Sequence, residues 1–317
     1  MWIRLIWCVR YGATAKTFLK PVLLNDAAGH QKLIRWATKR GQQARICMEA
    51  TGVYSLPLAV ALHNAPNVEV MVVNPKVIKN FATASMQRGK TDSMDAATIL
   101  NFLERMAFQP WHAPSTELLE IQHICRRVVQ LNTEVSRERN RHHAAKRVGP
   151  HGRLVANDTL VTMNHIQRRI VLLEQAVLEL IHSVPVLADK LSTITSATGI
   201  AFKTGSRILA EILVLPDDML APQWVAHTGL DPRPYESGTS TNKPRRISKA
   251  GNRYLREALY FPALVASRRD PNVKTYYEKL IARGKKPMQA LVAVMRKLLL
   301  AIWGMLHNNQ GWDGNKF

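Results

Sequence analysis

This sequence is poor in cysteine, and the shortage excludes two classes of protein. Its 317 residues include only three cysteines, Cys8, Cys47 and Cys125, which lie far apart in the chain. Three scattered thiols give neither a disulfide framework nor a CxxC zinc pattern, so we expect a reduced, cytoplasmic protein. Cys8 and Cys47 lie in apolar runs, where we expect them to be packing residues.

Acidic residues are also scarce. The chain has 23 Asp and Glu against 44 Lys and Arg, a net charge of +21, which favours a polyanionic partner such as DNA, RNA or a membrane surface. No apolar run reaches the length of a membrane span. The apolar start, residues 2–9, is interrupted by arginine, so we interpret it as a strand and not as a signal peptide. Nucleic acid is therefore the expected partner, and no membrane association is expected.

The first 110 residues alternate between strand-like and helix-like patterns, which predicts an α/β domain. Short apolar runs that end at turn residues indicate strands, and longer amphipathic runs indicate helices. The predicted strands are 2–9, 18–24, 44–50 and 68–75. The predicted helices are 30–40, 55–64 and a third from residue 91 to about 108.

Residues 111–183 form a second, basic segment. The pattern over 115–183 is helical except for the breaker cluster Gly149-Pro150-His151-Gly152, which predicts a helical hairpin or an antiparallel coiled coil. Its many arginines and lysines have two interpretations, a solvated helix face or an arm that follows nucleic-acid phosphates. The residues alone favour neither.

Residues 184–317 are predicted to form a mostly helical domain, with helices over 252–268 and 287–306. The tail, 311–317, is predicted to fray. Between helical patterns lies Thr198-Gly199-Ile200-Ala201-Phe202-Lys203-Thr204-Gly205. It is similar to a helix-hairpin-helix turn, whose backbone amides can bind a DNA phosphate.

Three carboxylates are candidate metal ligands. Glu49 lies at the carboxyl end of a predicted strand, and Asp92 and Asp95 are spaced to share one face at a helix start. Oxygen ligands of this kind suit Mg²⁺. The alternative needs no metal: Asp92 caps the helix, Asp95 occupies the third helical position, and Glu49 is an ordinary residue at a strand end.

Residues 228–260 place hydroxyl side chains beside a basic cluster. Ser237, Thr239 and Ser240 are equal candidates for a nucleophile on local chemistry, although such clusters are usually only loops. No acidic residue occurs between Glu236 and Glu257, and the intervening cations predict binding of nucleic-acid phosphates. These cations are Lys243, Arg245, Arg246, Lys249, Arg253 and Arg256.

Taken in order, these pieces resemble the transposases of a bacterial insertion-sequence family, family one-ten, which are DEDD recombinases guided by a bridge RNA. The resemblance extends from about residue 10 to residue 306. The matching segments are ICMEATGVY (46–54), VVNP (72–75), KTDSMDA (90–96), HTGLDPRPYESG (227–238), ISKAGNRYLREALY (247–260) and MRKLLLAIWGML (295–306).

The resemblance implies a fold and a set of partners. The fold is an RNase H-like (RuvC-like) domain over 1–110, a helical coiled-coil segment over 111–183 and a transposase domain with a serine loop over 184–317. The implied activity is DNA transposition by cleavage and rejoining of strands. The implied partners are element-end and target DNA, a guide RNA and further copies of the chain, as a dimer or tetramer, in the bacterial cytoplasm at the nucleoid.

The resemblance also implies residue roles. Glu49, Asp92 and Asp95 match acidic ligands of Mg²⁺, and Ser237 matches the nucleophile that becomes joined to DNA. One position departs from the pattern, because Ala13 stands where the family has its first metal-binding aspartate. A methyl group cannot coordinate Mg²⁺, so a catalytically impaired nucleic-acid-binding remnant is one alternative. A RuvC-like nuclease that uses metal-activated water is another.

Overall fold

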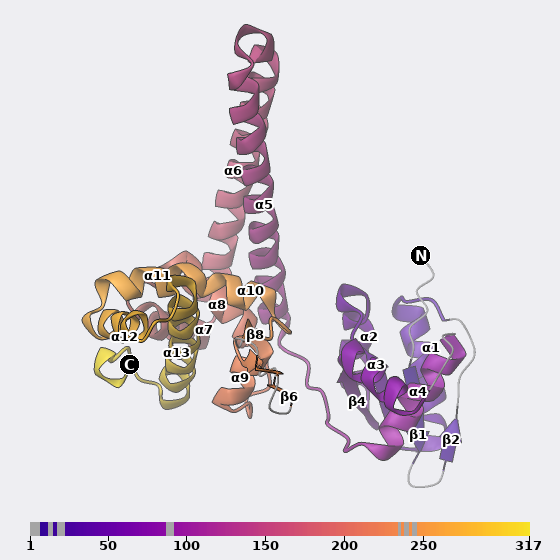
Figure 1. The fold of residues 1–317 in the computed structure, drawn as a ribbon. Helices are drawn as coiled ribbons and strands as arrows, with labels where there is room; N and C mark the ends of the chain where they lie inside the picture. The colour runs from indigo at the N-terminus through magenta and orange to yellow at the C-terminus, as the bar shows by residue number, and fades with distance from the viewer. Residues whose placement is uncertain are drawn as a thin grey trace. The chain divides into compact units, whose positions relative to one another are not determined.

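The chain forms two compact units, Met1–Ala113 and Pro114–Phe317 (Figure 1). The computed structural model describes residues 7–11, 15–17, 23–86, 92–233, 236–237, 241–242 and 246–317. Only the backbone is described for 7–11, 15–17, 236–237, 241–242, Arg40, Asp92 and Ser93. Each unit has its own hydrophobic core, and they are described separately.

The first unit contains a four-stranded sheet with the order β2-β1-β3-β4. β1 pairs antiparallel with both β2 and β3, whereas β3 and β4 are parallel. Parallel neighbours need a crossover, and helix α2 supplies it between β3 and β4. The strands are β1 (Trp7–Tyr11), β2 (Ala15–Thr17), β3 (Ala44–Glu49) and β4 (Val68–Val73).

Helices cover both faces of this sheet. Because side chains alternate along a strand, Ile46 and Met48 of β3 face one core while Cys47 faces another. The first core is closed by α1 (Ala27–Ala37) and α2 (Leu56–His63), and the second by α3 (Pro75–Ala84) and α4 (Asp92–Arg105). This arrangement confirms the predicted α/β part and the packing role of Cys47.

Local capping explains where the predicted elements were wrong. α1 begins before residue 30 because the Asp26 carboxylate accepts a hydrogen bond from Gly29 N at 2.8 Å. α3 was not predicted, since Asn74-Pro75 signals a strand end; here Asn74 caps the new helix and Pro75 is its first residue. Of the predicted strand 18–24, residues 18–22 lie outside the described residues and 23–24 belong to no strand, while β2 precedes this range.

The second unit begins with a long helical hairpin, α5 (Thr116–Arg147) and α6 (Arg153–Ser183), joined by the short 3-10 turn Gly149–Gly152 (Figure 1). Its seam contains apolar residues at spacings of three and four, as in a coiled coil. The fully or nearly buried members are Val128, Leu131, Val135, Ile166 and Ile170. The predicted hairpin and its breaker are therefore confirmed.

The remaining helices pack around one core that also includes the root of the hairpin. The predicted helix over 252–268 is in fact two helices, which meet at Leu259. α12 was not predicted as a separate helix. The helices are α7 (Pro185–Thr195), α8 (Phe202–Ile212), α9 (Ala221–Thr228), α10 (Arg253–Ala258), α11 (Tyr260–Arg269), α12 (Pro271–Ala282) and α13 (Pro287–Asn308).

α13 is the central helix of this core. In the described part of the chain it is the one unbroken helix long and apolar enough to cross a membrane. Its apolar residues are nevertheless core residues, since Val294, Leu298 and Ile302 are completely buried against neighbouring helices. Burial of this kind is what a core helix of a folded domain requires.

The C-terminal tail does not fray, so that prediction was wrong. Trp312 Nε1 donates a hydrogen bond to the Asp270 carboxylate at 3.0 Å, and Trp312 N donates to Ser196 Oγ at 2.8 Å. Phe317 packs against the core, where its ring meets Tyr276 edge to face. These contacts tie the last residues to α7, α11 and α12.

Candidate functional site

Glu49 is the last residue of β3, at the end where the parallel strands β3 and β4 both terminate. It lies opposite Val73 and is half-buried. A short turn follows it at once: Ser55 Oγ accepts from Thr51 N and donates to Gly52 O, each at 3.0 Å. This turn fixes the backbone that carries Glu49 into α2.

The same turn is anchored on α1 by two residues that sequence reasoning missed. Asn25 Nδ2 donates to Tyr54 O at 2.9 Å, and Asn25 Oδ1 is 2.8 Å from His30 Nε2. His30 is buried, and desolvation lowers its pKa despite the opposing charge of Asp26. No local pattern could reveal this link, because Asn25 and Tyr54 lie 29 residues apart.

The helix that carries the other two candidate ligands packs on the same sheet. α4 begins at Asp92 and contacts β1 and β3, the strand that ends at Glu49. Asp95 is half-buried in the first turn of α4, while the Asp92 side chain lies outside the described residues. Glu49 and Asp95 are oxygen donors of the kind that Mg²⁺ takes. Among the side chains that the structure describes, no group of three or more His, Cys, Asp or Glu could hold a metal ion.

The register of β1 shows which end of this strand is nearest in sequence to Ala13, the position that departs from the family pattern. Ala13 lies outside the described residues. β1 ends at Tyr11, which pairs with Ala44 at the start of β3, while Met48 pairs with Trp7. The end of β1 nearest Ala13 in sequence is therefore about 16 Å along the ladder from Glu49.

Ser237 lies in a hairpin of the second unit that contains two short pairs of strands, here called the inner tier and the outer tier. In the inner tier β5 (Pro232–Arg233) pairs with β8 (Arg246–Ile247). In the outer tier β6 (Glu236–Ser237) pairs with β7 (Thr241–Asn242), and Ser237 is directly opposite Thr241. The Ser237 side chain, Thr239 and Ser240 lie outside the described residues. The choice of Ser237 as the nucleophile among these hydroxyls therefore stays a prediction.

Hydrogen bonds join the two ends of this hairpin. Lys249 N donates to Gly229 O at 3.1 Å, and Ser248 donates to Asp231 through both N and Oγ, at 2.9 and 2.5 Å. Asn252 N donates to His227 O at 2.6 Å. The sequence segments 227–238 and 247–260 therefore meet at one place, which we call the hairpin base (residues 227–231 and 247–252).

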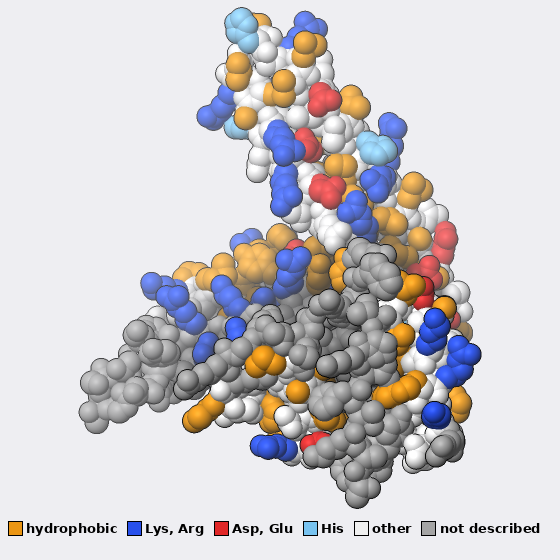
Figure 2. Space-filling model, turned by 90° about the vertical axis from the view of Figure 1, so that its right-hand side faces the viewer, with side chains coloured by type: hydrophobic (Ala, Val, Ile, Leu, Met, Phe, Trp, Pro, Cys, Tyr) orange, Lys and Arg blue, Asp and Glu red, His pale blue; other side chains and the backbone are white. Residues whose placement is uncertain are grey.

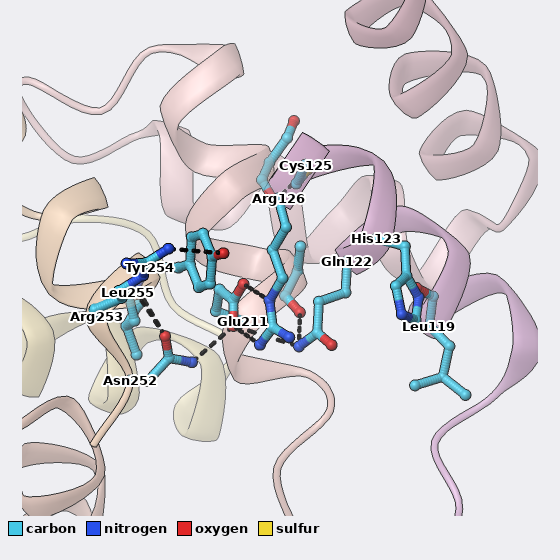
Figure 3. Close-up of polar contacts among 12 residues, drawn as sticks. Leu119, Gln122, His123, Cys125, Arg126, Glu211, Asn252, Arg253, Tyr254 and Leu255 are labelled. Atoms are coloured by element: carbon cyan, nitrogen blue, oxygen red, sulfur yellow. Dashed lines mark hydrogen bonds and ion pairs between the residues drawn. The ribbon is translucent and has the colours of Figure 1, made fainter. Parts of the chain in front are cut away.

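A buried polar cluster lies behind the hairpin base (Figure 3). Glu211 of α8 has a side chain only 3% exposed, and Arg126 of α5 pairs with both of its carboxylate oxygens, at 2.7 and 2.8 Å. Gln122 Nε2 and Asn252 Nδ2 donate to Glu211 Oε2 at 3.3 and 2.7 Å. Sequence reasoning missed this cluster; its one signal is a glutamate inside the apolar run Ile208-Leu209-Ala210-Glu211-Ile212.

The predicted phosphate-binding cations differ in their surroundings. Arg246, Lys249 and Arg253 are exposed, and Arg253 lies 4.9 Å from the centre of the Tyr254 ring. Arg256 is half-buried, and its Nη1 donates to Thr228 O at 2.8 Å, so it also holds the hairpin base. Lys243 and Arg245 lie outside the described residues.

Two further predicted nucleic-acid surfaces are visible in the second unit. Figure 2 shows Lys and Arg side chains recurring along the hairpin of α5 and α6. The turn between α7 and α8 contains Gly199 with a positive φ of 93°, and an added Cβ there would lie 2.6 Å from Pro262 O. This glycine is therefore required by close packing on α11 whether or not the turn binds phosphate.

Comparison with known proteins agrees with this layout. A family model described as "Transposase", of the DEDD IS110 type, matches residues 5–145. A second, described as "Transposase IS116/IS110/IS902 family", matches residues 191–278. The first match takes in Glu49, Asp92 and Asp95, and the second takes in the Ser237 hairpin.

Two relatives match over most of their length, and a third matches over part of it. The chain is 26% identical over 296 residues to a pilin gene-inverting protein of Moraxella bovis, covering 91% of this chain and 89% of the relative. It is 26% identical over 307 residues to the protein of that name in Moraxella lacunata, covering 95% and 92%. It is 29% identical over 153 residues to an insertion element IS110 protein of 43.6 kDa from Streptomyces coelicolor, covering 48% and 36%. With two models of this family matching residues 5–145 and 191–278 in order, the chain belongs to the IS110 family of transposases.

Proposed function

We propose that this protein recombines DNA by cleaving strands through Ser237 and rejoining them, with Mg²⁺ held by Glu49, Asp92 and Asp95. The observation that carries the proposal is the hairpin base. There, hydrogen bonds from Lys249, Ser248 and Asn252 bring the two C-terminal sequence motifs together beneath the strand that contains Ser237. A nucleophile on a short basic hairpin fits attack on a nucleic-acid backbone.

The chemistry exchanges one phosphate ester for another. Ser237 Oγ attacks phosphorus, a serine–phosphate bond forms, and the bond from phosphorus to the leaving sugar oxygen breaks. The serine proton leaves and the sugar oxygen gains one. The new ester retains the energy of the broken linkage, so attack by a strand's free hydroxyl can restore the backbone. Exposed Arg246 and Lys249 would bind neighbouring phosphates and offset their charge.

The first unit would supply the metal site on a RuvC-like, RNase H-like fold. Glu49 ends β3 and Asp95 lies on α4, which packs on that strand. When bound, Mg²⁺ neutralises negative charge that develops on the phosphate. Ala13 removes one carboxylate from the family's set, so we expect a higher Mg²⁺ requirement than a complete site would show. We assign this role to residues 1–110, nucleic-acid binding to 111–183 and strand transfer to 184–317.

The proposed partners are the element ends, target DNA, a guide RNA and further copies of the chain in the bacterial cytoplasm, at the nucleoid. The net charge of +21 and the basic hairpin of α5 and α6 support polyanionic partners. Two relatives are named for inverting a pilin gene, which supports rearrangement of DNA segments as the outcome.

A covalent adduct tests the proposal. The full-length protein is incubated with Mg²⁺, labelled element-end DNA and the RNA transcribed from its flank, and the products are separated on a denaturing gel. We expect a protein–DNA adduct with the unchanged protein and with the matched control Ser240→Ala, and none with Ser237→Ala. An adduct that survives Ser237→Ala and disappears in Ser240→Ala would overturn the assignment of the nucleophile.

Ala13 favours one second candidate, a nucleic-acid-binding protein that no longer cleaves DNA. In that case DNA binding weakens steeply with salt and is independent of Mg²⁺, and no adduct forms. An adduct that appears only in Ala13→Asp would identify an intact scaffold with a broken metal site. Cleavage without any adduct, unaffected by Ser237→Ala, would instead indicate a nuclease that uses water.

A further inference from the structure

Glu211 is a buried carboxylate that the proposed chemistry does not use. It lies in an apolar stretch of α8, where its neighbours Leu209, Ala210 and Ile212 are all buried in the core. A carboxylate in such surroundings is costly unless cations and hydrogen-bond donors surround it. Its partners therefore show which segments the residue holds together.

Those partners come from two segments far from α8 in the sequence. Arg126 and Gln122 belong to α5, and Asn252 precedes α10 (Figure 3). Asn252 makes hydrogen bonds through its side chain and its backbone. Its Nδ2 donates to Glu211, and its Oδ1 caps α10 by accepting from Tyr254 N and Leu255 N. Its backbone N donates to His227 O. Asn252 thus connects Glu211 to the hairpin base.

We propose that Glu211, through its hydrogen bond to Asn252, is a positioning residue for strand cleavage. The bond fixes the hairpin base against α8 and α5, and thereby sets where the strand containing Ser237 begins. This inference rests on the proposed function, in which Ser237 is the nucleophile. Glu211 is enclosed by protein groups, so it sets geometry and does not contact DNA.

The same cluster links the hairpin base to the basic arm. Arg126 lies on α5, which continues into the arm, and its guanidinium lies 5.0 Å from the centre of the Tyr254 ring in α10. Arg126 therefore contacts both Glu211 and the helix that follows the hairpin. Arg126 thus joins the root of the arm to the hairpin base through Glu211 and Tyr254.

Exchanging donor and acceptor in the hydrogen bond between Asn252 and Glu211 separates the role of that bond from the helix-capping role of Asn252. Asn252→Asp still caps α10, because Asp and Asn cap helices equally well, but it places a carboxylate oxygen 2.7 Å from Glu211 where a donor was. In the double variant Asn252→Asp/Glu211→Gln the Gln Nε2 can donate to the Asp carboxylate and its Oε1 can still accept from Arg126 Nε. The bonds that Arg126 Nη2 and Gln122 donate to Glu211 Oε2 are lost. The single variant breaks the bond and the double variant restores it with reversed polarity.

The measurement is the single-turnover rate of adduct formation with saturating element-end DNA, alongside the Kd for that DNA. We expect Asn252→Asp to slow adduct formation about 10- to 100-fold, with Kd unchanged within about twofold. We expect the double variant to recover part of the rate, because one bond to Asn252 is restored while those from Arg126 Nη2 and Gln122 are lost. Asn308→Asp, the same change at an exposed helix end, is the matched control and should behave as the unchanged protein.

An unchanged rate in Asn252→Asp would overturn the proposal. Hydrogen exchange of the amides in residues 227–252 gives a second readout that needs no cleavage. We expect faster exchange there in Asn252→Asp and recovery in the double variant. If the unchanged protein forms no adduct, the proposed function fails; the exchange result then still decides whether Glu211 holds the hairpin base.

Discussion

Gly251→Ala should open the hairpin base without removing any functional side chain. Gly251 has a φ of 115°, a region essentially restricted to glycine. An added Cβ would lie 2.0 Å from His227 O, the oxygen that accepts the hydrogen bond from Asn252 N. The methyl group therefore cannot be accommodated unless residue 251 moves away from residue 227.

The magnitude follows from two contributions. Backbone strain of this kind costs about 1–3 kcal/mol, and loss of the Asn252 N to His227 O hydrogen bond costs about 1 kcal/mol. We expect local opening to become easier by about 2–4 kcal/mol, or roughly 30- to 700-fold. Gly284→Ala is the matched control: its φ is 79°, but no atom lies within 4 Å of the added Cβ. It should cost only about 1 kcal/mol.

Native-state hydrogen exchange on the full chain measures both variants. Amides of residues 227–252 should exchange faster in Gly251→Ala. The effect of Gly284→Ala is measured from the exchange of amides in the turn between α12 and α13. Adduct formation should fall in the first variant and remain normal in the second. Equal, small effects at both glycines would refute the reasoning, because they would show that the contact with His227 O imposes no constraint.

Three further outcomes are expected. Burial lowers the pKa of His30 and of His227 below the usual 6.5, so below that pH the unfolded chain binds more protons than the folded chain. The urea midpoint of unfolding should therefore fall from pH 7 to pH 5, and it should fall less in His30→Gln. An identical fall in His30→Gln would contradict this. Leu298→Ala, at a completely buried position of α13, should lower the free energy of unfolding by about 2–5 kcal/mol, and a loss below 1 kcal/mol would be inconsistent with central packing. Arg246→Ala and Lys249→Ala should each reduce the slope of log Kd against log salt by about 1 on DNA, and an unchanged slope would exclude phosphate contact.

Much of the fold could be predicted from local patterns. β3, β4 and the hairpin of α5 and α6 were found because their apolar spacing is regular and their ends coincide with breakers. α3 was missed because Asn74-Pro75 is both a strand end and a helix cap, and only the packing of Ile78 against the sheet decides between them. The tail was misjudged because its stabilising contacts, such as Trp312 to Asp270, span 42 residues.

The candidate residues come from the sequence, whereas the contacts that support them come from the fold. Sequence motifs nominate Glu49, Asp95 and Ser237, and the roles assigned to these residues stay predictions. The groups that hold them do not follow any local rule. Glu211 meets Arg126 across 85 residues and Asn252 across 41, and Asn25 meets Tyr54 across 29. Such contacts depend on how elements pack, so only the folded chain reveals them.

The proposed division of chemistry between the two units predicts a specific pattern of additivity. Glu49 lies in the first unit and Asn252 in the second, so Glu49→Gln and Asn252→Asp should change the free energy of unfolding independently, and the double variant should show their sum. Strand cleavage should behave differently if both act on one phosphate. Glu49→Gln removes a group that the proposed attack requires, so little rate is left for Asn252→Asp to lower, and the combined loss of adduct formation should be less than additive. Measuring both quantities on the same four proteins tests this. Additive losses in the rate of adduct formation would mean that Glu49 and the hairpin base contribute independently of each other.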